Sequence, residues 1–312
     1  MKTKVTSSAA VAAREIRNGN IAAFPTETVY GLGANAFNES AVKKIFLAKN
    51  RPADNPLIVH IWSKSQFQEI APNVNPKTLR LVEEFFPGPL SVVVKKSSRI
   101  PAIVTAGLDT VCVRMPSLAI ARKFLRECGV PVAAPSANVS GIPSPTSWKH
   151  VLEDMNGKIP LILKGPDCEF GLESTVISCA GKKPVLLRPG AVSLEEIENV
   201  IGKVSVSANA RKALSPGMLH RHYCPKAKVV LVSGAEEVPE KKGARTAFIG
   251  FESCSCADFS FKPRDNSEYA QMLYSFLRES DSRNVKTIYA QLPDRKGFGL
   301  ALRDRLSRAS NK

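Results

Sequence analysis

The pattern of apolar and polar positions along this chain predicts short helices and strands in a mixed order. Apolar residues recur at helical spacing in residues 8–17, 39–48, 77–86, 118–127, 147–155 and 194–201. Short continuous apolar runs, typical of buried strands, fill residues 21–24, 57–61, 90–95, 111–114, 130–133, 159–163, 175–177 and 185–187. Because several strands follow one another without a helix, we expect an α/β fold with a twisted mixed sheet and flanking helices.

The periodic pattern is interrupted between residues 203 and 228. Serine, glycine and proline residues, among them Ser215, Pro216, Gly217 and Pro225, break it there. Beyond this segment, strand patterns at 229–232, 246–249 and 287–290 are combined with helical patterns at 267–278 and 299–308. This succession is typical of a small Rossmann-like unit. We therefore expect a first domain over residues 1–202, a linker over 203–228 and a second domain over 229–312.

The composition is that of a globular protein with two domains. The chain has 312 residues, more than one ordinary core accommodates, and 44% of them are hydrophobic. No apolar run approaches the roughly 20 residues that cross a bilayer, and no signal-peptide pattern follows Met1. The seven cysteines are odd in number and include no Cys-x-x-Cys pair. This usage favours reduced thiols and a cytoplasmic protein without membrane association.

The net charge of +16 fits two kinds of partner. Anionic small molecules such as nucleotide phosphates are one, and an RNA surface is the other. The basic residues form no dense tract with interleaved aromatic residues, which favours the first kind. Direct contact with tRNA stays open.

Two polar runs that follow predicted strands are candidates for a binding site. One extends from Pro25 to Gly33 and the other contains Ser136 and Asn138. Hydroxyls and free backbone N–H groups in such runs can hold a carboxylate or a phosphate, although they can equally cap the next helix. The first run lacks the third glycine of a dinucleotide fingerprint, and no P-loop motif occurs in the chain.

Lys49 and Arg51 end a predicted helix just before Pro52. The helix dipole alone explains one cation at such an end. Two cations close to Asn55 are better explained by binding of a polyphosphate.

The remaining candidate signals argue against covalent catalysis. His60 lies within a predicted strand, where a lone histidine is more often a core residue than a catalyst. The run from His220 to Cys224 fits no standard zinc spacing, and no protein ligand for a metal is assigned. No Ser/His/Asp or Cys/His arrangement stands out. The polar residues instead indicate a site that acts by positioning and electrostatics, as nucleotidyl transfer requires.

Several motifs together resemble the YrdC-like family, and the linker with the small second domain resembles its two-domain form. The motifs are Pro25-Thr-Glu-Thr-Val-Tyr-Gly-Leu-Gly33, Lys49-x-Arg51-Pro52, Asn55-Pro-Leu-Ile-Val-His60, Val113-Arg-Met-Pro116, Ala134-Pro-Ser-Ala-Asn138, Gly171-Leu-Glu-Ser-Thr175, Leu187-Arg-Pro-Gly190 and Ser215-Pro-Gly-Met218 with Arg221-His-Tyr223. The resemblance covers nearly the whole chain. It implies a catalytic domain with a basic concave cleft over which the linker closes.

The resemblance also implies an activity. An enzyme of this kind is a nucleotidyltransferase that converts L-threonine, bicarbonate and ATP, with Mg²⁺, into threonylcarbamoyl-AMP and pyrophosphate. A partner tRNA threonylcarbamoyl transferase machinery then uses this product to modify an adenosine in tRNA. The alternatives are an RNA-binding translation factor without catalysis and an enzyme that transfers a carbamoyl group to another acceptor.

Carried over position by position, the resemblance implies three groups of site residues. The residues expected on the threonine side are Thr28, His60, Arg114, Ala134 and Ser174. The residues expected to bind ATP are Arg51, Asn55, Thr110, Ser136, Asn138, Ser144, Arg188 and Tyr223. The residues expected to assist catalysis by neutralising the triphosphate are Lys49 and Arg51.

Overall fold

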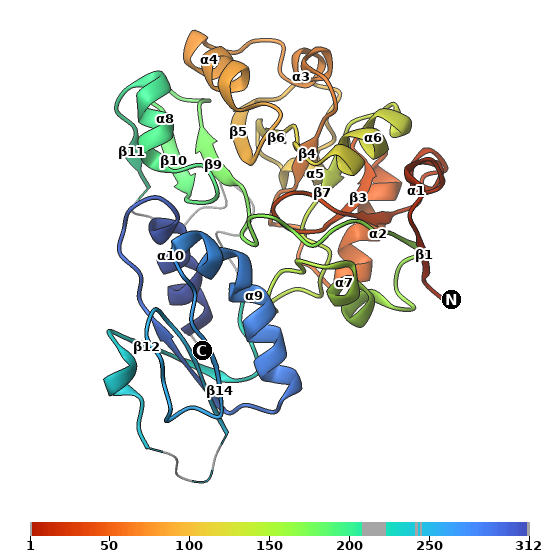
Figure 1. The fold of residues 1–312 in the computed structure, drawn as a ribbon. Coiled ribbons are helices and arrows are strands. Elements are labelled where there is room, and N and C mark those ends of the chain that lie inside the picture. Colours follow the sequence, from red (N-terminus) through yellow and green to blue (C-terminus); the bar gives the residue numbers. More distant parts are fainter. Residues whose placement is uncertain (1, 208–222, 241–242, 244, 311–312) are drawn as a thin grey trace.

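The computed structural model describes residues 2–207, 223–240, 243 and 245–310. Figure 1 shows a larger unit, coloured red to green, beside a smaller one in cyan and blue. Within the described residues, one sheet has 11 strands and the other has 4. The expected fold class, a mixed α/β sheet with flanking helices and a smaller second unit, is confirmed.

The strands of the large sheet are short and run in both directions. In sheet order they are β1 (Lys4–Thr6), β8 (Leu161–Leu163), β2 (Ala22–Phe24), β3 (Gly31–Asn35), β7 (Val132–Ala134), β4 (Ile58–His60), β6 (Thr110–Arg114), β5 (Leu90–Lys95), β9 (Thr175–Ser178), β10 (Val185–Arg188) and β11 (Ser205–Val206). At the centre, β4 is parallel to β6 and antiparallel to β7. The β4–β6 register sets His60 beside Arg114 at the carboxyl ends of both strands.

Helices cover both faces of the large sheet. They are α1 (Ala9–Arg17), α2 (Glu39–Lys49), α3 (Lys64–Ile70), α4 (Pro76–Phe85), α5 (Ala102–Thr105), α6 (Ala119–Cys128), α7 (Trp148–Met155) and α8 (Leu194–Ile201). Helices α1 and α6 share one buried apolar cluster, and the others pack into a second, larger cluster. The cap residues of α2 are local: the Asn38 side chain accepts from the Ala41 N–H, and Asn50 ends the helix at a φ of 49°.

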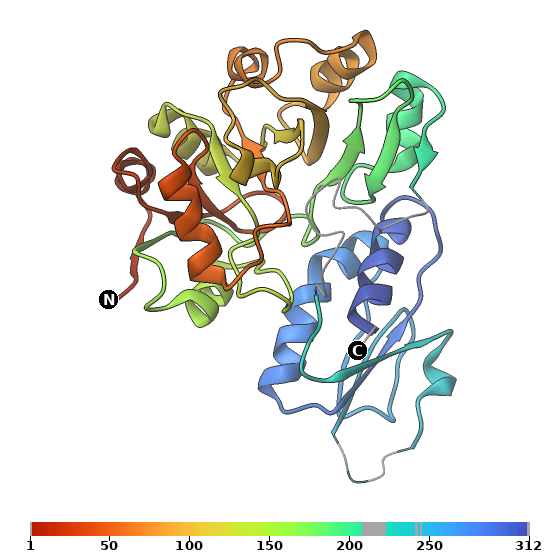
Figure 2. The same cartoon turned by 180° about the vertical axis from the view of Figure 1, so that it is seen from behind.

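The second unit has a parallel sheet. Its strands, in sheet order, are β12 (Lys228–Val232), β15 (Thr287–Gln291), β13 (Thr246–Ile249) and β14 (Phe259–Phe261). It also contains a 3₁₀ turn (Ala235–Glu237) and the helices α9 (Asn266–Ser282) and α10 (Phe298–Ser310). Seen from behind, α9 and α10 lie between the small sheet and the larger unit (Figure 2).

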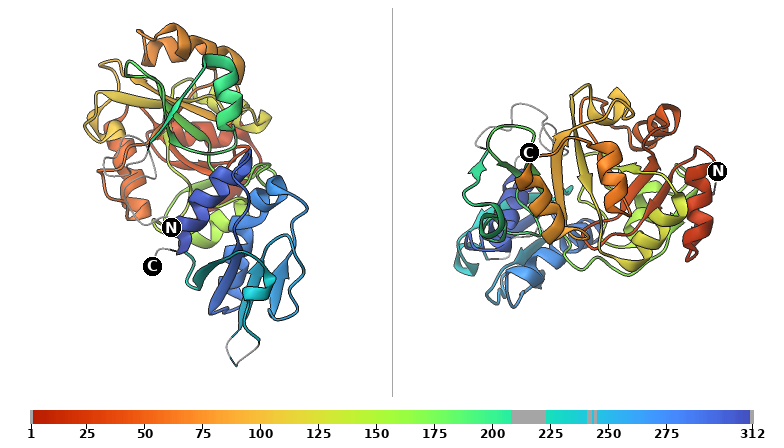
Figure 3. Two further views of the ribbon diagram at one scale, coloured as in Figure 1. Left: turned by 90° about the vertical axis from the view of Figure 1, so that its left-hand side faces the viewer. Right: turned by 90° about the horizontal axis from the view of Figure 1, so that it is seen from above.

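The two units are docked through buried contacts. Val29 and Leu172 of the larger unit belong to the same buried apolar cluster as the core of the smaller one. Arg278 of α9 forms an ion pair with Asp154 of α7, with 2.6 Å between Nη2 and Oδ2. The side and top views in Figure 3 show the smaller unit lying against one side of the larger. Val29 and Leu172 of the first unit therefore share an apolar core with the second unit.

The structure adds elements that the sequence pattern did not predict. Residues 31–35, which begin within the first polar run and end beyond it, form β3, antiparallel to β2, where the sequence pattern predicted no strand. Glycine is required there because a Cβ on Gly33 would lie 2.6 Å from Val132 Cγ1. Further elements without a sequence signal are β1, α3, α5, β11 and β14. Most are too short to establish a periodicity. Much of the expected linker, residues 208–222, lies outside the described part of the chain.

Candidate active site

A pocket opens where the central strands of the large sheet end. It is bordered by the turn after β2, the end of α2, the ends of β4, β6 and β7, and the loops around Ser144 and Ser174. Most residues predicted for the site line this pocket, namely Thr28, Lys49, Arg51, His60, Arg114, Ala134, Ser136, Asn138, Ser144, Ser174, Arg188 and Tyr223. Residues from distant parts of the chain are thus brought around one cavity.

Two predicted residues do not line the pocket. Thr110 begins β6, whose other end is Arg114, so the two lie about 13 Å apart along the strand. Thr110 borders a separate depression with Lys95 and Ser178. Asn55 is buried behind Arg51, whose Nη2 donates to the Asn55 carbonyl oxygen at 3.2 Å.

A buried apolar cluster lies between Thr110 and the pocket. Thr110, Cys112 and Arg114 alternate along β6 and therefore face the same side of the sheet. Cys112 belongs to a small buried cluster with Ile58, Val93, Val176 and Leu187. Of this cluster, Ile58 also lines the pocket, so the cluster packs against the pocket wall on the side towards Thr110.

Arg114 is held in place by an adjacent polar run. Its Nη1 donates to Thr28 Oγ1 at 2.7 Å, and its Nη2 donates to Glu27 Oε1 at 2.6 Å. Burial would raise the pKa of the Glu27 carboxyl, but the Arg114 charge and hydrogen bond lower it. Glu27 was not among the predicted site residues. The sequence feature that could have identified it is a carboxylate between two threonines at the end of a predicted strand.

His60 is buried and uncharged at neutral pH. Its ring lies nearly perpendicular to the Phe24 ring, with 5.5 Å between the ring centroids, and its Nδ1 has no hydrogen-bond partner among the described residues. Burial, and secondly the charge of Arg114, lower the pKa of His60 to about 3. The imidazole therefore offers the pocket a neutral polar group.

Lys49 joins the end of α2 to the second polar run. Its side chain is 1% exposed, and its Nζ donates to the carbonyl oxygens of Ser136, at 2.6 Å, and of Asn138. Burial, and next the charge of Arg51, hold the pKa of Lys49 well below its ordinary value. Lys49 thus orients the 136–138 loop as well as facing the pocket.

Arg51 faces the pocket from the loop after α2. Its Nη2 donates to the carbonyl oxygens of Asn55 and Pro56, at 3.2 and 3.3 Å. Part of its surface borders the pocket opening, yet the guanidinium is shielded from water, and this desolvation lowers its pKa to about 10. It stays protonated at neutral pH.

Arg188 and Ser174 form the opposite wall. The Arg188 Nη2 donates to the Ser174 carbonyl oxygen at 3.0 Å and to its Oγ at 3.2 Å. The Ser174 hydroxyl also lies 2.8 Å from the Ser91 hydroxyl. Gly190 permits this packing because a Cβ there would lie 2.3 Å from the Thr175 nitrogen.

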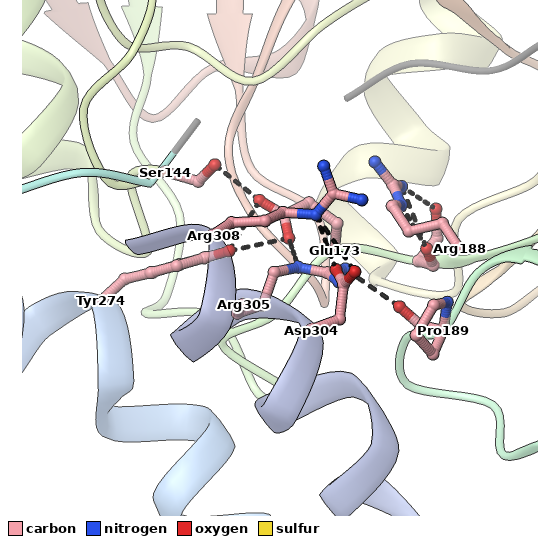
Figure 4. A network of polar contacts seen from close by, with 9 residues as sticks. Ser144, Glu173, Arg188, Pro189, Tyr274, Asp304, Arg305 and Arg308 are labelled. Atoms are coloured by element: carbon pink, nitrogen blue, oxygen red, sulfur yellow. Dashed lines mark hydrogen bonds and ion pairs between the residues drawn. The ribbon is translucent and has the colours of Figure 1, made fainter. Parts of the chain in front are cut away.

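Glu173, which also lines the pocket, is the second carboxylate that the sequence prediction missed. Its carboxylate accepts a hydrogen bond from Ser144 Oγ at 2.6 Å and forms an ion pair with Arg305 of α10 (Figure 4). Its signal was the charged position inside Gly171-Leu-Glu-Ser-Thr175. Its partner Arg305 had no sequence signal.

Tyr223 is the first described residue after the gap at 208–222. It is buried, adopts a φ of 69°, and stacks on Tyr274 of α9 with 5.4 Å between ring centroids. The next residue, Cys224, donates its N–H to the Gly141 carbonyl at 2.9 Å. The other predicted linker motif residues, Ser215 to Met218 and Arg221 to His222, lie outside the described residues.

Neither a metal cluster nor a membrane span is found in the part of the chain that the structure describes. Within it, no three His, Cys, Asp or Glu side chains come together as metal ligands would. No helix in that same part is long and apolar enough to cross a bilayer.

The mixed sheet, its basic pocket and the docked parallel unit define a known class of protein. The profile of the family described as "Telomere recombination", which groups Sua5, YciO and YrdC, matches residues 14–190. The profile described as "Threonylcarbamoyl-AMP synthase, C-terminal domain" matches residues 192–311. The chain therefore belongs to the Sua5/YciO/YrdC family, in its two-domain form.

Individual relatives agree along almost the whole chain. Threonylcarbamoyl-AMP synthase from Pyrococcus abyssi is 45% identical, over 96% of this chain and 93% of that protein. The enzyme of the same name from Bacillus subtilis is 42% identical, over 96% of this chain and 92% of that protein. The crystal structure of P. abyssi Sua5 complexed with L-threonine gives a TM-score of 0.91 at 44% identity, covering 97% of this chain and 94% of that one.

Proposed function

We propose that this chain is an enzyme that makes threonylcarbamoyl-AMP and pyrophosphate from L-threonine, bicarbonate and ATP. The observation that carries the proposal is that Arg114, a guanidinium able to pair with a carboxylate, and the Lys49–Arg51 pair line one pocket. Relatives covering nearly the full chain bear the name of this activity, and a similar structure is complexed with L-threonine.

On the threonine side, Arg114 is the group that binds the amino-acid carboxylate. Glu27 and Thr28 keep its guanidinium oriented, so little reorganisation accompanies binding. Neutral His60, the Ala134 backbone and the Ser174 hydroxyl supply the remaining polar contacts. Discrimination against serine depends on one methyl group, which limits what binding alone can achieve.

On the nucleotide side, Lys49, Arg51 and Arg188 supply positive charge for the triphosphate. Ser136, Asn138, Ser144 and Tyr223 surround the nucleotide. Thr110, also predicted to bind ATP, lies beyond the buried cluster that contains Ile58 and Cys112. Asn55 does not face the nucleotide and contributes by accepting a hydrogen bond from Arg51 at its carbonyl oxygen, which orients Arg51.

Mg²⁺ fits this site as a companion of ATP. Glu173 is the one carboxylate among the described residues of the pocket wall, and Arg305, Tyr274 and Ser144 already occupy its oxygens. Phosphate oxygens and water are the usual ligands of Mg²⁺ in such sites. The metal supplies charge neutralisation of the triphosphate, and the protein residues hold ATP around it.

The reaction needs no protein nucleophile. The threonine amine first takes up carbon dioxide from bicarbonate to form a carbamate, with release of water. A carbamate oxygen then attacks the α-phosphorus of ATP and forms a new P–O bond. The bond from the α-phosphorus to the oxygen that bridges it to the β-phosphorus breaks, and pyrophosphate leaves. The chain's residues orient both reactants and stabilise the developing charge. The product serves a cytoplasmic tRNA threonylcarbamoyl transferase machinery.

Pyrophosphate release from ATP and bicarbonate tests the proposal. We expect release with L-threonine and much less with serine or alanine. Pyrophosphate release that does not depend on threonine would indicate another acceptor. A chain that releases no pyrophosphate and binds RNA would indicate a translation factor. Identification of threonylcarbamoyl-AMP by mass spectrometry completes the test.

A further inference from the structure

The second unit binds a carboxylate of the pocket wall through two of its side chains. Glu173 Oε2 accepts from Arg305 Nε at 2.8 Å and from the Tyr274 hydroxyl at 2.9 Å. Glu173 Oε1 accepts from Ser144 Oγ at 2.6 Å and from the same Tyr274 hydroxyl at 3.2 Å. Figure 4 shows Tyr274 and Arg305 approaching Glu173 from helices of the second unit, with Ser144 on the other side.

Arg305 pairs with Asp304 of its own helix through Nη1, at 2.5 Å, and its other nitrogens contact the first unit. Its side chain is fully buried, and its Nη2 donates to the Pro189 carbonyl oxygen at 3.0 Å. Its guanidinium also lies 5.4 Å from the ring centroid of Tyr223. A buried charge of this kind is tolerated only when it is paired and hydrogen-bonded, so α10 is docked by its contact with Glu173.

This contact keeps Glu173 ionised. Burial would raise the pKa of Glu173, but the charges of Arg305 and Arg188, together with the Ser144 hydrogen bond, lower it to about 2. An ionised carboxylate can only accept hydrogen bonds. The single hydroxyl hydrogen of Ser144 is therefore directed at Glu173.

The direction of that hydrogen decides what Ser144 can offer a ligand. Its oxygen has lone pairs left and no hydrogen left, so it accepts from a donor and cannot donate to a phosphate. ATP carries such donors on its ribose and on its base, and none on its ionised phosphates. Tyr223, held against Tyr274 and Arg305, faces the same pocket.

We propose that Tyr274 and Arg305 of the second unit are positioning residues, which fix Glu173 and through it turn Ser144 into an acceptor for the nucleoside part of ATP. The inference rests on the proposed function for its ligand, but it concerns binding and can be tested without turnover. Threonine binding on the Arg114 side is expected to be independent of this contact.

The experiment measures binding of AMP, ATP and inorganic triphosphate to the full chain by calorimetry. Tyr274→Phe removes one donor from Glu173 and leaves every charge in place. We expect the Kd for AMP and for ATP to rise by the same factor, about three- to tenfold, with triphosphate binding unchanged.

Tyr269→Phe is the matched control. Tyr269 is also fully buried on α9, but its hydroxyl donates to the carbonyl oxygens of Ile249 and Gln291 within the second unit. Both variants lose one buried hydroxyl, so both lower the Tm, and only Tyr274→Phe is expected to weaken AMP binding.

Equal AMP affinities in the two variants would overturn the inference, as would weakened triphosphate binding in Tyr274→Phe. Arg305→Lys gives a second measurement, because it keeps the charge and loses the planar hydrogen-bonding fork. It is expected to show the same selective loss of AMP affinity. A wild-type chain that binds AMP with this pattern but makes no threonylcarbamoyl-AMP would refute the proposed activity alone.

Discussion

At the scale of single residues, the cations around the pocket are held by oxygen atoms of the protein. Arg114 is held by Glu27 and Thr28, Lys49 by two carbonyl oxygens, and Arg51 by two more. Side chains fixed in this way need little rearrangement when charge develops on a reacting phosphate. Preorganisation of this kind suits a site without a nucleophile.

Arg51→Ala is the residue-scale test of that view. We expect pyrophosphate release to fall by at least about 100-fold, because a guanidinium that stabilises the leaving phosphates is lost. The fold should persist, since Arg51 contacts only the carbonyl oxygens of its own loop among the described hydrogen bonds. Steady-state pyrophosphate assays with circular dichroism check both statements.

Arg51→Lys is the accompanying control. It keeps the charge without the bidentate geometry, so its activity should lie between those of wild type and Arg51→Ala. Near-normal turnover in Arg51→Ala would contradict the role proposed for this residue.

At the scale of elements, the loop before β9 packs closely against the second unit. Gly171 has a φ of 67°, and a Cβ on it would lie 2.4 Å from the Gln271 Cα in α9. Two residues later the same loop presents Glu173 to α9 and α10. The approach of a helix backbone to this glycine therefore sets the position of a pocket residue.

Gly171→Ala should weaken this docking. The positive φ alone costs about 1 kcal/mol for alanine, and the clash with α9 adds to it. We expect a lower Tm and a higher KM for ATP. Thermal denaturation and steady-state kinetics measure these effects.

Gly129→Ala separates the two causes. Gly129 has a φ of 69°, and a Cβ added there would meet no atom within 4 Å, so only the backbone cost applies. If Gly171→Ala and Gly129→Ala lower the Tm equally and have the same KM for ATP, the close approach of α9 to Gly171 does not affect nucleotide binding.

At the scale of the whole molecule, the two units are coupled by apolar packing and by buried charge. Val29 and Leu172 belong to the core of the second unit, and Arg305 reaches the pocket wall. Removing one partner of such a pair leaves an uncompensated charge, which is more costly than removing both. The second unit is thus part of the environment of the active site.

Acid should weaken this coupling. The pKa of Glu173 is lowered from 4.5 to about 2, so the unfolded chain binds more protons between these values. The stabilisation by ionised Glu173 is therefore present above pH 4.5 and is lost as the pH falls towards 2. Urea denaturation of wild type and Glu173→Gln across this range measures it.

We expect wild type to be the more stable protein at pH 6, with the difference between the two narrowing as the pH falls. A difference that stays constant with pH would mean that the Glu173 carboxylate contributes no net charge interaction to stability.

Much of the local structure and most of the pocket residues could be predicted from the order of amino acids. Helix α2 followed from its apolar spacing and ends close to the predicted residue, because its cap residues are local. Lys49, Arg51, Arg114 and Arg188 were recognised from motifs at strand or helix ends. Such signals are read within a few residues and need no knowledge of the fold.

How those residues are paired could be seen only in the folded chain. Glu173 and Arg305 are 132 positions apart, and no periodicity connects a loop of the first unit to a helix of the second. Thr110 was predicted from the family resemblance, outside any of the quoted motifs, and it lies at the far end of β6, away from the pocket lining. Hydrophobic periodicity reports which face of an element is buried, whereas the partner of a buried charge depends on which elements meet there.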